Sequence, residues 1–174
     1  MAAVSMSRRS TAGIIFIVAG VLLALAVLLP LVGVAVGGWL AAIAFLAIAA
    51  ALAVLGIGAV NATLTKVLLI AAAVGWLLLA LVAFGLALPS VLITIAALVA
   101  GVAGLIAAIV LYVGKEVRNL PAVIFIITTA LGLLFLLPRI GVSLAGLATI
   151  IAVLFAAGLI VTGVLFAQKE RGRR

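Results

Sequence analysis

Few side chains in this sequence could do chemistry, and most of them are hydroxyls. Thr128 and Thr129 are adjacent inside a long apolar run, and Arg139 follows Pro138 at the end of that run. Polar groups at membrane depth are where solutes and ions are bound, and an interfacial arginine can hold a lipid phosphate or a small anion. We therefore take Thr128, Thr129 and Arg139 as a candidate polar site. The alternatives are threonines bonded to the backbone or to a neighbouring helix, and an arginine that caps the end of a span.

Other kinds of site are excluded by residue type. The sequence has no cysteine, histidine or aspartate, and its only acids are Glu116 and Glu170. Thiolate and imidazole metal sites are therefore impossible, and nothing could activate Ser143 as a nucleophile. Glu116 lies between Lys115 and Arg118, where a solvated ion pair is expected. We predict no catalytic residue, no metal and no cofactor, and hence no enzyme.

The composition indicates where such a chain can fold. Hydrophobic residues make up 71% of the 174 positions and charged residues 7%, whereas a soluble domain has roughly half and about a quarter. Too few polar side chains are present to cover an apolar interior in water. The sequence therefore predicts an integral membrane protein.

Proline and glycine divide the uncharged runs into segments of membrane-spanning length. A helix needs about 20 apolar residues to cross the hydrocarbon core, and each run is long enough for two. The breaks fall at Pro30–Trp39, at Pro89-Ser90 and at Pro138–Gly141. We predict one all-α transmembrane domain, residues 1–174, whose six helices form three hairpins. The expected spans lie near 12–32, 39–60, 67–88, 91–113, 120–138 and 143–167, and a basic cytoplasmic tail follows at 168–174.

The basic residues set the orientation of these spans independently of hydropathy. Six spans place nine of the ten basic residues on the side that carries both termini, and Arg139 alone on the other side. The nine are Arg8, Arg9, Lys66, Lys115, Arg118, Lys169, Arg171, Arg173 and Arg174. Because cytoplasmic loops carry the excess of lysine and arginine, both termini are predicted to be cytoplasmic.

The N-terminal region allows a second interpretation. Arg8-Arg9, the apolar stretch after them and Ala24-Leu25-Ala26 are together similar to a signal peptide with its cleavage site. Cleavage would leave the apolar segment 27–39 as a stub, and the apolar run continues well past the site. We therefore favour an uncleaved first span.

The three hairpins share features that suggest a loose repeat. Pro30, Pro89 and Pro138 stand close to the end of each odd span. The even spans carry small residues at helical spacing, as at Ala96, Ala100, Gly104 and Ala108 in the fourth, at Ala148, Ala152 and Ala156 in the sixth, and at Ala47 and Ala51, and Ala49 and Ala53, in the second. Such faces allow close helix packing. We expect even spans inside the bundle and odd spans outside, with an alanine-rich genome as the alternative source of the pattern.

This layout, from Arg9 to Gln168, resembles the HdeD-like family of small six-span bacterial inner-membrane proteins linked to acid resistance. The resemblance rests on three hairpins, the prolines near the outer turns, the basic cytoplasmic loops, and the glycines Gly20, Gly75 and Gly132 that precede the prolines. It implies a stress-related or accessory role, and no functional residue is carried over from it.

Two functions from different classes follow from the sequence. The first is a non-enzymatic structural or accessory protein of the bacterial plasma membrane, related to envelope or acid stress. The alternative is a substrate-binding or accessory subunit of a membrane transporter, which the absence of charge within the spans disfavours. Expected partners are membrane lipids, with anionic headgroups at the cytoplasmic face, and a homo-oligomer or a larger membrane complex stays open. Nucleic acid is not expected, because the basic residues form no continuous face.

Overall fold

The computed structural model describes residues 2–168, with side chains from Arg8 onward, and every regular element in that part of the chain is helical. Six segments of 20 to 24 residues are long and apolar enough to cross a bilayer. We number them as spans 1 to 6. They are Arg8–Leu31 within α1 (Ala2–Leu31), α2 (Trp39–Gly58), α3 (Thr63–Ala83), Ser90–Val113, Asn119–Ile140 and α7 (Leu147–Ala167).

Spans 4 and 5 are composite. Span 4 joins α4 (Ser90–Leu98), a π-helical turn (Val99–Ala103) and α5 (Gly104–Val113), while span 5 joins α6 (Asn119–Leu136) and a 3₁₀ turn (Leu137–Ile140). The predicted six-helix all-α bundle is thus confirmed. The basic residues of the predicted tail, from Lys169 on, lie outside the described residues.

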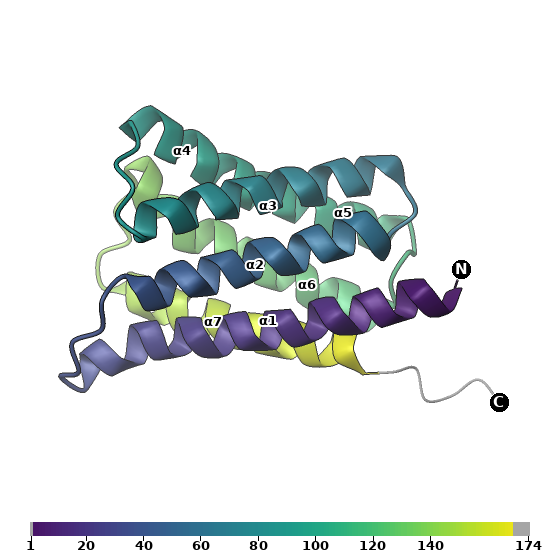
Figure 1. Cartoon of the computed structure of the whole chain (residues 1–174), viewed down its shortest axis with the longest axis horizontal. Coiled ribbons are helices and arrows are strands. Elements are labelled where there is room, and N and C mark those ends of the chain that lie inside the picture. The colour runs from purple at the N-terminus through teal and green to yellow at the C-terminus, as the bar shows by residue number, and fades with distance from the viewer. Residues whose placement is uncertain (1, 169–174) are drawn as a thin grey trace.

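The six spans form a closed ring in chain order. Each span packs on the preceding and following ones, and span 6 packs on span 1 (Figure 1). Among the described helices, no Cα atom of one span lies within 8 Å of a span that is not its neighbour in the ring. No span lies inside the others, so the expected layout with odd spans outside the even ones is not found. The even spans are nevertheless the more buried set: 56%, 44% and 39% of the residues in their apolar stretches are buried, against 22%, 39% and 28% in the odd spans.

The small-residue faces of the even spans lie at helix interfaces within this ring. In span 4, Ala96, Ala100, Gly104 and Ala108 are all buried. In span 6, Ala152 and Ala156 are buried but Ala148 is exposed. These small-residue faces therefore allow each even span to approach its two ring neighbours closely.

Three glycines end the odd spans at the end of the bundle that is opposite the termini. Gly33, Gly85 and Gly141 all have left-handed φ angles, of 82°, 100° and 89°. At each of them the amide of the next residue bonds to the carbonyl five residues before it, as Leu86 does to Leu81 at 3.0 Å. This is the Schellman arrangement, which glycine favours because it lacks a Cβ.

The prolines do not share one structural place, contrary to expectation. Pro30 is in the last turn of α1 and Pro138 in the 3₁₀ turn, but Pro89 caps the start of α4. Gly85 already ends α3, which stops at Ala83 and not near residue 88. The feature that recurs in the three hairpins is the glycine cap.

Candidate functional site

The threonines of the candidate polar site lie in α6 and face the ring interior. The Thr128 hydroxyl donates to the Ile124 carbonyl at 2.8 Å and lies 2.9 Å from the hydroxyl of Thr162 in α7. Because Thr128 has a single proton, Thr162 is the donor of that pair. The Thr129 hydroxyl donates to the Phe125 carbonyl at 3.0 Å. The hydroxyl protons of both threonines are therefore used inside the bundle. This is the alternative in which the threonines bond to the backbone or to a neighbouring helix.

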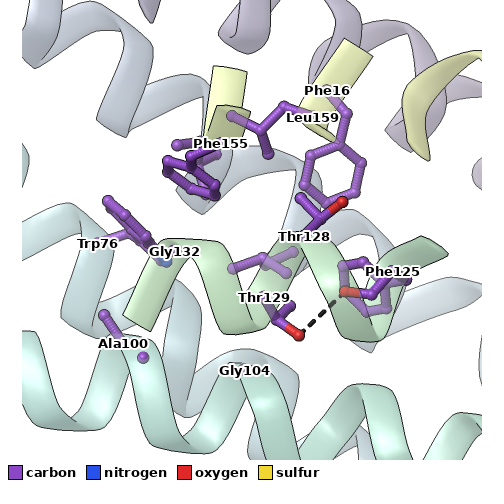
Figure 2. A pocket seen from close by; sticks show the side chains of 13 residues that line it. Phe16, Trp76, Ala100, Gly104, Phe125, Thr128, Thr129, Gly132, Phe155 and Leu159 are labelled. Carbon is purple, nitrogen blue, oxygen red and sulfur yellow. Dashed lines mark hydrogen bonds between the residues drawn. The ribbon is translucent and has the colours of Figure 1, made fainter. Parts of the chain in front are cut away.

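A small cavity lies beside these threonines, near the middle of the bundle. Its volume is about 20 Å³, and Thr128, Thr129 and Gly132 line it from span 5 (Figure 2). The π-helical turn and α5 contribute Ala100, Gly101 and Gly104. One water needs about 10–15 Å³, so the cavity has room for about one water molecule. A small-molecule site usually measures about 300–1,000 Å³.

Two layers of aromatic side chains close the bundle on either side of this cavity. The outer layer, at the end away from the termini, consists of Phe45, Trp76, Phe135 and Phe155. Trp76 stacks on Phe155 with centroids 5.7 Å apart, and Phe45 lies 5.3 Å from Trp76. Figure 2 shows Trp76 and Phe155 on one side of the threonines, with Phe16 and Phe125 on the other.

The inner layer lies nearer the termini. It consists of Phe16, Phe125 and Phe166, with centroids between 5.7 and 6.4 Å apart. Contacts such as Phe16–Phe125 and Phe45–Phe135 join spans that are not neighbours in the ring. Sequence reasoning did not find these layers, because the phenylalanines follow no common spacing. Which of them face inward depends on how each helix is rotated.

Arg139 lies at the outer end and is not brought together with the threonines. Its guanidinium carbon is 5.9 Å from the ring centroid of Phe45, which belongs to span 2 on the opposite side of the ring. A cation over an aromatic face is stabilised by the ring quadrupole. The candidate polar site is therefore two separate places, a threonine pair within the bundle and an arginine above the outer aromatic layer.

The start of α1, the α2–α3 connection and the α5–α6 connection lie at the end of the bundle that carries the termini (Figure 1), and these segments hold the described basic residues other than Arg139. Arg9 donates two hydrogen bonds to the Ala59 carbonyl, at 3.0 and 2.8 Å, and so caps the C-terminus of α2. Arg8 lies against Gly58. Lys66 is in the first turns of α3, and Lys115 and Arg118 lie in the loop after span 4. Lys169, Arg171, Arg173 and Arg174 lie outside the described residues.

Glu116 has a role at this end that sequence reasoning missed. Its carboxylate accepts hydrogen bonds from the backbone N–H of Asn61 at 2.8 Å and from the Thr65 hydroxyl at 3.3 Å. A carboxylate at a helix N-terminus is favoured by the helix dipole. Glu116 thus joins the loop after span 4 to the start of α3. The Asn61–Thr65 polar segment was a signal for this contact, since it offers donors on the same side of the membrane.

Within residues 2–168, no three histidine, cysteine, aspartate or glutamate side chains gather in a way that could hold a metal ion. Comparison with known proteins gives no relative from which a role could be transferred. No protein-family model, curated protein or solved structure matches this chain.

Proposed function

We propose that this chain is a non-enzymatic integral membrane protein with a structural or accessory role in the bacterial plasma membrane. The observation that carries the proposal is the filled bundle interior, where Thr128 and Thr162 bond to each other beside a cavity of about 20 Å³. Polar groups already paired in this way are not available to a substrate. The protein therefore acts through its surfaces, toward lipid and toward other membrane proteins.

The proposed orientation places both termini in the cytoplasm. By the bounds of their helices, Arg8, Arg9, Lys66, Lys115 and Arg118 belong to one end of the bundle and Arg139 to the other, which agrees with the positive-inside rule. Basic side chains at the cytoplasmic end would attract anionic lipid headgroups, each by about 1 kcal/mol. Lipids are therefore the first partners that we propose.

The substrate-binding subunit of a transporter is the less favoured function. A bound vitamin or similar solute would need a cavity of about 300 Å³ or more, far above the 20 Å³ at the centre of this bundle. Native mass spectrometry of the purified chain tests this directly. We expect lipid adducts but no solute at one per chain, and a polar solute bound at that ratio would contradict the proposal.

A role in envelope or acid stress is the finer part of the proposal, and the HdeD-like layout supports it. Deletion of the gene should lower survival after acid or envelope stress, and the wild-type gene should restore survival. As a matched control, a Gly13→Leu variant should fail to restore survival, because Gly13 lies against span 6 without room for a side chain. Unchanged survival of the deletion strain under both stresses would remove the stress role. A mild-detergent pull-down from the same strain would identify a partner complex.

A further inference from the structure

A groove runs along the surface of the bundle between α2 and α3, which lie side by side (Figure 1). Its volume is about 290 Å³, against about 20 Å³ for the central cavity. Ala49 of α2 and Ala73 of α3 are each only 6% exposed and form its floor. The walls are the exposed side chains of Leu46, Val74 and Leu77. In a membrane, this groove opens toward the lipid.

The lining and width of the groove fit a hydrocarbon chain. Every residue that lines it is alanine, valine, leucine or isoleucine, so it offers no polar side chain to a solute. Its lining on α2 extends from Leu46 to Ala53, which is about 10 Å along a helix, so that volume corresponds to a channel about 5 Å wide. A helix with its side chains is about 10 Å wide. A helix of a second copy would therefore cover the groove without filling it.

The groove leads along α3 to a basic residue. Lys66, Ile70 and Leu77 lie on one face of α3, because positions four and eleven residues apart are aligned along a helix. From Lys66 to Leu77 the helix rises about 16 Å. This is close to the depth of one leaflet, which is half of a hydrocarbon core about 30 Å thick. A lipid whose headgroup lies at Lys66 can therefore place its acyl chain along the groove.

Arg8 adds a second positive charge at the same end of the groove. Its exposed side chain lies against Gly58 in the last turn of α2, and the Lys66 carbonyl is 3.4 Å from the position of a Cβ on Gly56. The two basic residues therefore flank the last turn of α2, one from α1 and one from α3. Glu116, the single acid among residues 2–168, bonds to the start of α3 and forms no ion pair with either of them. Within that part of the chain, both positive charges are available to an anionic headgroup.

We propose that the α2–α3 groove binds one anionic phospholipid of the leaflet at the end that carries the termini. Its phosphate lies at Lys66 and Arg8, and one acyl chain lies in the groove between Leu46 and Leu77. This inference rests on the proposed function, in which lipids are the first partners, and it assigns the lipid class and the site. A zwitterionic headgroup carries a cation of its own, which Lys66 and Arg8 repel.

Native mass spectrometry of the delipidated full chain, titrated with phosphatidylglycerol, tests the acyl-chain site. Ala50 lines the groove and Ala157 lies in α7, outside it, and both are exposed. Ala50→Phe should weaken binding of the first phosphatidylglycerol about fivefold, because the acyl chain loses packing contacts with the groove. Ala157→Phe is the matched control and should leave the dissociation constant at the wild-type value. Circular dichroism would show that each variant is folded.

The headgroup contacts have a separate test, which does not depend on the fold of the groove variant. Lys66→Gln should weaken phosphatidylglycerol binding about fivefold, the usual effect of one basic side chain near an anionic lipid surface. Lys115→Gln removes an equal charge from the loop after span 4, at the same end of the bundle, and should change binding little. Phosphatidylcholine should bind the wild type more weakly than phosphatidylglycerol does, and Lys66→Gln should not weaken it further.

Two results would overturn the proposal. One is equal phosphatidylglycerol binding by the wild type and a folded Ala50→Phe variant. If that variant also converts a wild-type dimer to a monomer, a second copy covers the groove instead of a lipid. The other is an equal loss of binding in Lys66→Gln and Lys115→Gln, which would indicate general attraction to a basic surface. Neither result affects the accessory role, which only a bound polar solute would remove.

Discussion

Gly13 of span 1 and Gly163 of span 6 face each other with no space for a side chain. A Cβ atom on Gly13 would lie 2.6 Å from the Gly163 carbonyl oxygen, and one on Gly163 would lie 2.5 Å from the Gly13 carbonyl oxygen. The obstructing atoms belong to backbone, which cannot move aside as a flexible side chain does. This contact joins the first span to the last, so it closes the ring.

Gly13→Ala should therefore weaken the bundle. We expect the free energy of unfolding to fall by about 1–3 kcal/mol, the usual cost of overpacking, when unfolding in detergent is followed by circular dichroism. Gly146→Ala is the matched control, because nothing lies within 4 Å of a Cβ at that position. Equal stability of the two variants would mean that spans 1 and 6 do not approach as closely as described.

The Thr128–Thr162 hydrogen bond predicts a measurable coupling between α6 and α7. Thr128→Val and Thr162→Val keep the side-chain shape and remove the hydroxyls. In a double-mutant cycle we expect a coupling of about 0.6 kcal/mol and at most about 1.7 kcal/mol, the range for hydrogen bonds between membrane helices. Thr94 bonds only to the Ser90 carbonyl of its own helix, so Thr94→Val paired with Thr162→Val should show no coupling. A coupling of the same size in both cycles would contradict the assigned pair.

Glu116 should stabilise the start of α3 through charge as well as hydrogen bonding. Glu116→Gln keeps the size of the side chain but removes the negative charge near the helix N-terminus. We expect a loss of about 0.3–1 kcal/mol in the free energy of unfolding at low salt, and a smaller loss at high salt. Lys115→Gln removes a neighbouring charge. Because the Lys115 side chain is exposed, this substitution should change the free energy of unfolding little. An equal effect of both substitutions would argue that only the total charge of the loop matters.

The glycine at the outer end of span 5 should tolerate asparagine better than alanine. Gly141 has a φ of 89°, a left-handed conformation that costs about 1–2 kcal/mol for an ordinary L-residue. Gly141→Ala should lower stability by that amount, and Gly141→Asn by less, since asparagine adopts this conformation more readily. A thermal unfolding series in detergent would rank the two variants, and the reverse order would contradict a left-handed cap.

The number of spans was predictable from the sequence because hydropathy and helix breakers are local signals. Gly33 and Gly141 stand in the breaks that mark the first and third hairpins, and their caps follow from the same local pattern. The break at Pro89 predicts an end of α3 near residue 88, whereas Gly85, four residues earlier, ends the helix at Ala83. Composition says where a helix can end, but only the cap geometry decides which glycine ends it.

The ring and its interior were not predictable in the same way. Whether Thr128 meets Thr162, or Phe45 meets Arg139, depends on the rotation of each helix about its axis. Nearly uniform apolar spans carry almost no periodic signal for that rotation, because lipid and protein interior are equally apolar. The small-residue stripes showed that helices approach closely, as Ala100 does at Gly75, but not whether the helix that carries them lies inside the bundle.

The central claim is a six-span bundle with both ends in the cytoplasm, and cysteine accessibility tests it most directly. The chain contains no cysteine, so single cysteines can be placed at Ala35, Ala87 and Ser143 in the outer loops, and at Asn61 and Asn119 at the other end. All five positions are exposed. A membrane-impermeant maleimide added to intact cells should label the first three, and the last two only after permeabilisation. Labelling of Asn61→Cys or Asn119→Cys in intact cells, with protection of the other three, would contradict the orientation, and a mixed pattern within either group would contradict the six spans.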